Sequence, residues 1–332
     1  MRSVICSDIA PDCRKFLCAV HKPIRLYNGV EKRGFADRKL DLYTAGFPCQ
    51  PWSSEGKGEG RQDKLGRGKV FDHISRYIDR AQPTVFCLEN VSALTHSQHK
   101  DAFNAILETL RKSGLYFVTW RVLNSSDFGL PQSRHRLFIV GLLRAKMNPR
   151  FTGFPWPKPR SRMPLPLERF LCGGKGILKR TWPKKSVIAK QIKNAEARIR
   201  AAGGDPSKKM YAVDANSGCG APNMMCDRVP CLTRTRAACG GYFLTREDLR
   251  RFLCVEEMLN LQGLPVTFRA QACRAGITDR QLAQMVGNAI PTNILMILLA
   301  RMLTVVDLQG SQRELRTLQH TRCGPPQHTR CV

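Results

Sequence analysis

Acidic residues are scarce in this chain of 332 residues, in which 26 Asp and Glu stand against 54 Lys and Arg. The formal net charge is +28, and the sequence pI is about 10.1. Such an excess excludes a surface of balanced charge and predicts a polyanionic partner, because Lys and Arg that neutralise phosphates release counterions. Nucleic acid is the leading candidate, and a basic surface that only maintains solubility is the alternative.

Long apolar segments are missing as well. The most apolar run, 294–306, is too short to span a bilayer and contains Arg301, so we expect a buried helix and no membrane association. The first residues lack the charged segment, apolar stretch and small-residue cleavage site of a secretion signal. We therefore expect an intracellular protein, located in the nucleus if the source is eukaryotic.

Cys-x-x-Cys pairs are also absent among the 14 cysteines. Scattered thiols without such pairs favour reduced cysteines and argue against a disulfide framework and against a metal site. One alternative stays open, a structural zinc ion bound by the four thiols that lie closest in sequence. These are Cys219, Cys226, Cys231 and Cys239.

Apolar runs typical of strands alternate with helical segments in the first half of the chain. The strand candidates are 4–9, 40–45, 85–88, 117–123 and 137–141. The spacing of apolar residues over 102–110 predicts a helix, which Gly114 would end. This alternation predicts an α/β fold with a doubly wound, mostly parallel sheet covered by helices on both faces. Ligands of such sheets bind beyond the carboxyl ends of the strands, where catalytic residues are therefore expected.

Composition divides the chain into four parts. We predict a catalytic core over 1–150, a smaller lobe over 151–240, a segment that returns to the core over 241–306 and a disordered tail over 307–332. Proline and basic residues mark the crossing into the smaller lobe. The tail repeats the sequence QHTRC, which is typical of a segment outside the fold.

A basic helix is predicted within the smaller lobe, over 186–202. Apolar residues line one side of it, and lysines and arginines occupy the rest. Such a helix suits a position along a phosphate backbone, and a helix whose charges face water is an equally good interpretation. Further along, Thr245 followed by Asp248 predicts the start of another helix.

The strongest chemical signal is a cysteine between two prolines in the sequence GFPCQPWS. Cys49 follows the predicted strand 40–45, with Pro48 before it and Pro51 two residues after it. Proline fixes the backbone, so the thiol should point into the crevice above the sheet, where its thiolate form is a nucleophile. The alternative is a small buried apolar side chain, the usual role of an isolated cysteine. The glycine-rich stretch 55–68 suits a loop that closes over a substrate.

Two further motifs place charged residues at strand ends. In the sequence LENV, Glu89 ends an apolar strand, where burial would raise its pKa and let it hold a proton near neutrality; a surface carboxylate is the alternative. In QSRHR, Arg134 and Arg136 are two residues apart on an extended segment and point the same way. Both can therefore reach one polar target, or one can brace the other.

In these motifs the sequence resembles the cytosine-C5 DNA methyltransferase family. GFPCQPWS is similar to its catalytic-cysteine motif, GRGKVFDHI to the helix that follows, LENV to its glutamate motif and QSRHRLFIVG to its paired-arginine motif. EEMLNLQGLP and MVGNAIPTNI resemble its closing segments. The likeness runs from Val4 to about Met302 and is weakest between Pro157 and Asp227, which corresponds to the family's target-recognition region.

The resemblance implies the class I, Rossmann-like methyltransferase fold, with S-adenosylmethionine as methyl donor and C5 of cytosine as acceptor. In this family a cysteine thiolate adds to C6 of a base flipped out of the duplex, a role that falls to Cys49. Glu89 would protonate ring N3, and Arg136 would contact the base carbonyl. Arg134 would support the site, and Gln132 would position the loop. Further substrate-binding residues implied are Gln50, Ser53, Asn90, Val91, Arg234 and Arg236.

The resemblance also assigns residues to the cofactor, and it shows two departures. The cofactor residues would be Asp8, Ile9, Phe47, Pro48, Gly287 and Asn288. Family members open with a strand and a glycine-rich turn, F-x-G-x-G-G, and nothing of that kind precedes Val4. We therefore expect the first strand of the sheet to be missing and its two neighbours to have unpaired backbone groups. A missing strand would fit a fragment, an incomplete gene model or a decayed copy. The carboxylate that faces adenine in the family is also absent at Asn28 and Gly29.

Two other functions stay open beside DNA methylation. The first is cytosine-C5 methylation of RNA, although the Cys-Phe-Thr tripeptide of the family's transfer-RNA branch is not present. The second is an inactive nucleic-acid-binding remnant, which the missing glycine-rich turn supports. In all three cases the partner is nucleic acid, with DNA favoured, and the oligomeric state is open.

Overall fold

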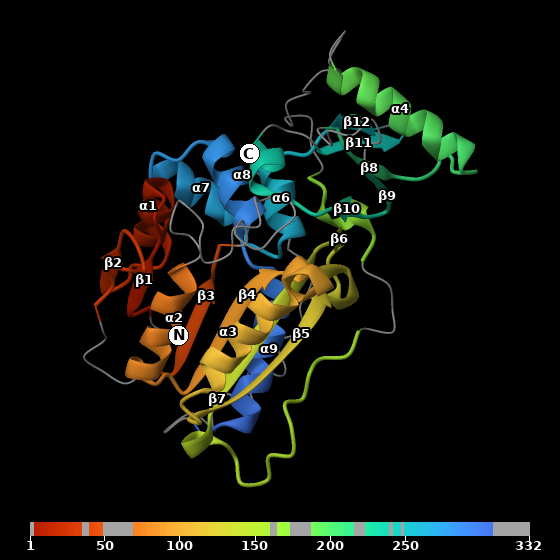
Figure 1. The fold of residues 1–332 in the computed structure, drawn as a ribbon. Coiled ribbons are helices and arrows are strands. Elements are labelled where there is room, and N and C mark those ends of the chain that lie inside the picture. The colour runs from red at the N-terminus through yellow and green to blue at the C-terminus, as the bar shows by residue number, and fades with distance from the viewer. Residues whose placement is uncertain are drawn as a thin grey trace.

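The computed structural model describes residues 3–34, 40–48, 69–159, 165–172, 187–215, 223–238, 242–246 and 249–307. Its central sheet has the strand order β3-β4-β7-β5. These strands are β3 (Leu42–Gly46), β4 (Val85–Val91), β7 (His135–Leu143) and β5 (Tyr116–Asn124). Helices α2 (Val70–Ala81) and α3 (Lys100–Arg111) lie on one face of this sheet, and α9 (Thr292–Val305) lies on the other (Figure 1). The strands predicted for this sheet and the helix predicted over 102–110 are confirmed.

Alternation along β4 explains why both faces of the sheet are covered. Phe86 and Leu88 belong to the core under α2 and α3, and Val85 and Cys87 belong to the core under α9. Successive side chains of a strand point to opposite faces, so a strand that is apolar throughout needs a layer on each side. The two-sided helical cover that defines a doubly wound sheet is therefore present.

The direction of the central strands agrees with the predicted mostly parallel sheet only in part, because β3, β4 and β5 run the same way and β7 runs against them. In the central sheet β3 and β4 pair in parallel, whereas β4–β7 and β5–β7 pair antiparallel. The cause is the short connection from β5 to β7, which holds only a 3-10 turn (Ser125–Phe128) and the two-residue strand β6 (Gln132–Ser133). A parallel crossover needs a dozen or more residues and usually a helix, so this connection returns the chain in the opposite direction.

A separate pair of strands lies at the start of the described chain. Strands β1 (Ile5–Ser7) and β2 (Arg25–Tyr27) pair in parallel and are connected by α1 (Pro11–Val20). Among the strands that the structure describes, none pairs with both β1 and β3, and no pairing joins the two sheets. This break falls where the sequence predicted unpaired strand edges.

The smaller lobe contains an antiparallel sheet of order β12-β11-β8-β9. Helix α4 (Val187–Ala201) packs on it through Ile192, which shares a core with Phe243 and Phe252. The helix predicted over 186–202 is confirmed. Strand β10 (Val229–Pro230) pairs with β6 and so joins this lobe to the core. The four strands of the sheet are β8 (Tyr211–Asp214), β9 (Met224–Cys226), β11 (Tyr242–Arg246) and β12 (Leu249–Phe252).

The helix start predicted at Thr245 is wrong. Thr245 lies in β11, where it pairs with Arg250 of β12, and the next helix, α6 (Val255–Leu261), begins only after Cys254. The reason is the capping box, in which Cys254 and Glu257 satisfy the free amides at the helix start. Because that box lies downstream, the segment before it is free to pair as a strand.

Helices α7 (Thr267–Arg274), α8 (Asp279–Asn288) and α9 complete the described chain. Helix α8 ends at Asn288, and α9 begins at Thr292 directly after Pro291. Within the described ranges no single helix is long and apolar enough to cross a bilayer, whereas the bent pair α8 and α9 passes that test together by length and composition. The predicted tail lies, from residue 308 on, outside the described residues.

Candidate functional site

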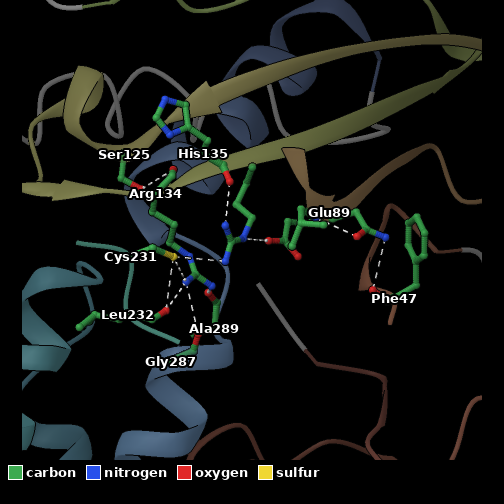
Figure 2. Close-up of polar contacts among 12 residues, drawn as sticks. Phe47, Glu89, Ser125, Arg134, His135, Cys231, Leu232, Gly287 and Ala289 are labelled. Carbon is green, nitrogen blue, oxygen red and sulfur yellow. Dashed lines mark hydrogen bonds and ion pairs between the residues drawn. The ribbon is translucent and has the colours of Figure 1, made fainter. Parts of the chain in front are cut away.

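An ion pair between neighbouring strand ends forms the centre of the site (Figure 2). The guanidinium Nε of Arg136 lies 3.0 Å from Oε1 of Glu89, and the two side chains are only 14% and 11% exposed. Strand pairing brings them together, because Val91 at the end of β4 is opposite Arg136 on β7. The Glu89 and Arg136 predicted from separate motifs are therefore joined in one site.

Burial changes the pKa of Glu89. Desolvation raises the pKa of this carboxyl above its usual range, and the charges of Arg136 and Arg134 partly oppose that rise. The second carboxylate oxygen lies 3.3 Å from the position that a Cβ would take on Gly46, so the end of β3 passes directly over Glu89. A larger residue than glycine would crowd the carboxylate at this point.

The loop that follows β3 is tied to the same strand end. The side-chain amide of Asn90 donates to the backbone carbonyl of Phe47 at 3.4 Å, and its oxygen accepts from the amide of Val91. Phe47 itself is buried against Phe71 of α2, with ring centroids 5.6 Å apart. The described chain continues only to Pro48. The predicted residues Cys49, Gln50 and Ser53 lie outside the described residues.

Arg134 connects three segments beneath the ion pair. Its guanidinium donates to the carbonyls of Leu232 at 2.6 Å, Gly287 at 3.3 Å and Ala289 at 2.7 Å. The residue is 1% exposed, and burial lowers its pKa. Two of these carbonyls lie at the end of α8, where the partial negative charge of a helix favours a cation. The side chain predicted to support the site therefore holds the end of α8 and the smaller lobe against the paired-arginine strand.

Gln132 makes a second connection of the same kind. Its fully buried amide donates to the carbonyl of Leu261 at 2.8 Å and to Oε1 of Gln262 at 2.9 Å. Its oxygen accepts from the amide of Leu232 at 3.2 Å. Because its oxygen and nitrogen are both used inside the protein, Gln132 positions neighbouring segments.

Cys231 is a residue of this site that the sequence did not reveal. Its sulfur lies 3.3 Å from Nη1 of Arg134 and 3.6 Å from Nη2 of Arg136, so both arginines contact one polar atom (Figure 2). The sequence presented Cys231 only as an alternative zinc ligand. Its position depends on the pairing of β10 with β6, which the local sequence does not predict. Of the other zinc candidates, Cys226 is exposed on β9, and Cys219 and Cys239 lie outside the described residues.

Gly287 and Asn288 end α8 next to this cluster. A Cβ on Gly287 would lie 2.4 Å from the carbonyl oxygen of Thr233 and 2.7 Å from the amide nitrogen of Arg234. Only glycine allows α8 to approach that segment so closely. Asn288 is exposed.

The two arginines predicted to bind substrate have different surroundings in the structure. Arg236 is held by an ion pair with the buried Asp214 of the smaller lobe, at 3.0 Å. Burial raises the pKa of the Cys13 thiol on α1 to about 11, and the positive charge of the exposed Arg234 partly opposes that rise. Both begin α5 (Arg234–Ala238) but face different parts of the molecule.

The predicted cofactor residues lie in two places. Asp8 and Ile9 follow β1, the carboxylate of Asp8 accepts from the amide of Ala10 at 2.8 Å, and Ile9 is 78% exposed. Phe47 and Pro48 follow β3 in the other sheet. The region after β2 holds a carboxylate that the sequence did not reveal, because Glu31 folds back over Gly29, with its oxygens 2.2 and 2.4 Å from where a Cβ would be. Two carboxylates, those of Asp8 and Glu31, therefore lie in the segments that follow β1 and β2.

Comparisons with known proteins identify the family of this chain. The sequence profile of the C-5 cytosine-specific DNA methylases matches residues 1–304. The chain is 32% identical over 274 residues to the type II methyltransferase M.NgoBI of Neisseria gonorrhoeae, covering 82% of this chain and 77% of that protein. It is 30% identical over 299 residues to M.HaeII of Haemophilus aegyptius, covering 86% and 80% of the two chains.

Solved structures with a similar fold include two methyltransferases. The Entamoeba histolytica methyltransferase EhMeth aligns with a TM-score of 0.55 at 14% identity over 92% of this chain and 98% of that one. The S. pombe Dnmt2 methyltransferase aligns with a TM-score of 0.55 at 15% identity over 91% and 90%. From the profile match and these relatives, the chain belongs to the C-5 cytosine-specific DNA methylase family, whose enzymes transfer a methyl group from S-adenosylmethionine to C5 of cytosine.

Proposed function

We propose that this chain methylates cytosine in duplex DNA through a covalent adduct with Cys49, while Glu89 and Arg136 hold the base. The observation that supports these roles is the buried ion pair of 3.0 Å between Glu89 and Arg136, at the carboxyl ends of β3 and β4. It offers a carboxyl and a guanidinium side by side, which match ring N3 and the carbonyl O2 of cytosine. A base flipped out of the duplex would enter above this pair.

The chemistry requires a nucleophile because cytosine C5 is unreactive. The Cys49 thiolate forms a bond to C6 while Glu89 donates a proton to N3, which turns the ring into an enamine that is nucleophilic at C5. Burial raises the pKa of Glu89, which favours the protonated form that this step requires. Bound S-adenosylmethionine supplies the electrophilic methyl group. Loss of the C5 proton and cleavage of the carbon–sulfur bond then release methylated base and free thiolate.

Asp8 and Glu31 are the residues proposed to hold the cofactor, with Phe47 at the side of the pocket. Carboxylates at the carboxyl ends of β1 and β2 are where such sheets bind ribose and adenine. Asp8 is half-buried and anchored by its bond to Ala10, which fixes its orientation. Gly287 contributes by close packing and Asn288 by its exposed amide.

The preference for DNA over RNA is proposed from the charge and the smaller lobe. On α4, four basic residues are exposed, while Ile192, Ala195 and Ile199 between them are buried. A helix with one apolar face packed on a sheet and one basic face outward suits a phosphate backbone.

We propose that the predicted lobe over 151–240 recognises the target, although its sheet continues to Phe252. The two sequence relatives named above, M.NgoBI and M.HaeII, are bacterial, which gives no support to a nuclear location. The exposed basic residues are Lys190, Lys193, Arg198 and Arg200.

Trapping on 5-fluorocytosine tests the proposal. Fluorine at C5 cannot leave as a proton, so the protein, S-adenosylmethionine and a substituted duplex should yield a covalent complex that survives denaturing electrophoresis. Cys49→Ser should give none, and Cys18→Ser, which changes an exposed cysteine of α1, should trap like wild type. Binding of duplex DNA without adduct would identify an inactive binding protein, and trapping confined to RNA would overturn the DNA preference.

A further inference from the structure

Two cysteines outside the site described above lie next to each other where the smaller lobe meets α6. Cys172 follows the 3-10 turn at Leu167–Phe170, and Cys254 precedes α6. Their two sulfur atoms and a carboxylate oxygen of Glu257 all lie within 4.8 Å of one another. Both thiols are partly exposed, and Glu257 is fully buried. The methyl transfer proposed above uses none of these three residues.

Glu257 holds the backbones of both cysteines in place. One carboxylate oxygen accepts from the amide of Cys172 at 3.0 Å, and the other accepts from the amide of Cys254 at 2.9 Å. Because a single rigid carboxylate binds both amides, the two main chains are fixed side by side although they are far apart in sequence. A disulfide requires such proximity of the two backbones before oxidation.

A metal ion is not the best occupant of this cluster. Both oxygens of Glu257 also accept from Arg251, at 2.8 and 2.5 Å, so the carboxylate has no free position to offer a cation. The guanidinium adds a positive charge next to the thiols, which repels a second cation. The same charge favours a thiolate.

We propose that Cys172 and Cys254 are an oxidation site, which a peroxide converts into a reversible disulfide. The Cys172 thiolate attacks one peroxide oxygen, the O–O bond breaks, and a sulfenic acid forms as hydroxide leaves. The Cys254 sulfur then attacks that sulfenic sulfur, the S–S bond forms, and a second hydroxide leaves as water. Two thiols and one hydrogen peroxide thus give one disulfide and two waters, and a dithiol reductant reverses the change.

The two sulfurs are suited to different roles in this sequence. A hydrogen bond from Cys254 lowers the pKa of Cys172, and the nearby charge of Arg251 acts in the same direction. The same hydrogen bond and, after it, burial raise the pKa of Cys254. The hydrogen bond from Cys254 thus favours Cys172 as the attacking thiolate and leaves Cys254 to resolve the sulfenic acid.

The disulfide would join the two ends of the smaller lobe. Cys172 lies where the chain enters α4 and its sheet, and Cys254 lies where the chain leaves β12. Their neighbours Leu171 and Leu253 pack in one apolar core, so the bond would form without separating packed layers. A cross-link that encloses α4 and its sheet restricts their unfolded chain and should raise the melting temperature of the oxidised protein by about 5 °C.

Peptide mapping of the full chain tests the proposal. Protein is treated with hydrogen peroxide, alkylated with N-ethylmaleimide and digested with trypsin without reductant. The expected product is a cross-link between peptides 170–175 and 252–269, which disappears with dithiothreitol. Cys254→Ser, which keeps a good capping residue, should abolish the cross-link and the gain in melting temperature. Cys273→Ser, which changes an exposed cysteine of α7, should retain both.

Two outcomes would overturn the assignment. In the first, Cys172 and Cys254 are both recovered alkylated after peroxide treatment, while other cysteines of the same sample are oxidised. In the second, the reduced protein binds Zn²⁺ in a titration, Cys254→Ser loses that binding, and no cross-link forms. Because the mapping uses neither DNA nor S-adenosylmethionine, failure here is distinguishable from failure of the proposed methyl transfer.

Discussion

Gly287 and Thr233 are packed so closely that a side chain does not fit between them. A Cβ on Gly287 would lie 2.4 Å from the carbonyl oxygen of Thr233, a distance at which real carbon and oxygen atoms repel strongly. The contact joins the end of α8 to the segment that leads from β10 into α5. The same segment carries Cys231 and Leu232, which contact Arg134, so this packing supports the arginine side of the site.

Gly287→Ala should therefore destabilise the protein by about 2–4 kcal/mol, because backbone must move to accept the methyl group. Urea unfolding measures the effect. Gly153→Ala is the matched control, since a Cβ there meets no atom within 4 Å, and it should change the free energy of unfolding by less than about 0.5 kcal/mol. Equal stability of the two variants would show that α8 does not pack in this way.

Arg134→Lys tests the connection made by the buried guanidinium. Lysine cannot reach the carbonyls of Leu232, Gly287 and Ala289 together, so buried acceptors lose their donors at a cost of about 2–4 kcal/mol. The exposed Arg150→Lys serves as the control and should be neutral. A stability for Arg134→Lys equal to that of wild type would remove the proposed clamp.

The sequence predicted those parts of the fold that depend on local pattern. Continuous apolar runs identified the strands of the central sheet, and the motifs identified Glu89 and Arg136, which lie 3.0 Å apart. Each of these signals is contained in a few adjacent residues. Nothing had to be known about the partner of a strand to recognise them.

Features that depend on pairing between distant segments could not be predicted in this way. The antiparallel direction of β7 follows from the short β5–β7 connection, and a run of apolar residues has no direction. Cys231 reaches the arginines because β10 pairs with β6. The side chain of Glu31 folds back over Gly29 and places a carboxylate there. Matching the sequence to the family motif position by position finds no carboxylate at Gly29.

Glu89→Gln tests the proton assigned to this carboxyl. An amide keeps the shape and can still accept from Arg136, but it has no acidic proton for N3, so the initial rate of 5-fluorocytosine trapping should fall by roughly 10²–10⁴-fold. Glu108→Gln, an exposed change on α3, should trap at the wild-type rate. Rapid trapping by a folded Glu89→Gln protein would show that another group protonates the base.

The pH dependence of stability tests the burial of Glu89 without DNA or cofactor. Burial raises the pKa of Glu89 in the folded protein, so the folded state binds its proton more tightly than the unfolded state, whose pKa is about 4.3. The stability of wild type relative to Glu89→Gln should therefore be greatest below that value. It should fall as the pH rises toward the folded pKa and stay constant above it.

Urea unfolding of the two proteins, in buffers from about pH 4 to about pH 8, measures this difference, and the other titrating groups cancel because both proteins contain them. The buried ion pair makes the sign informative. If Arg136 stabilised the carboxylate by more than burial opposes it, the folded pKa would be lowered, and wild type would gain on Glu89→Gln as the pH rises. A gain of that kind would mean that Glu89 is ionised at neutral pH and holds no proton for the base.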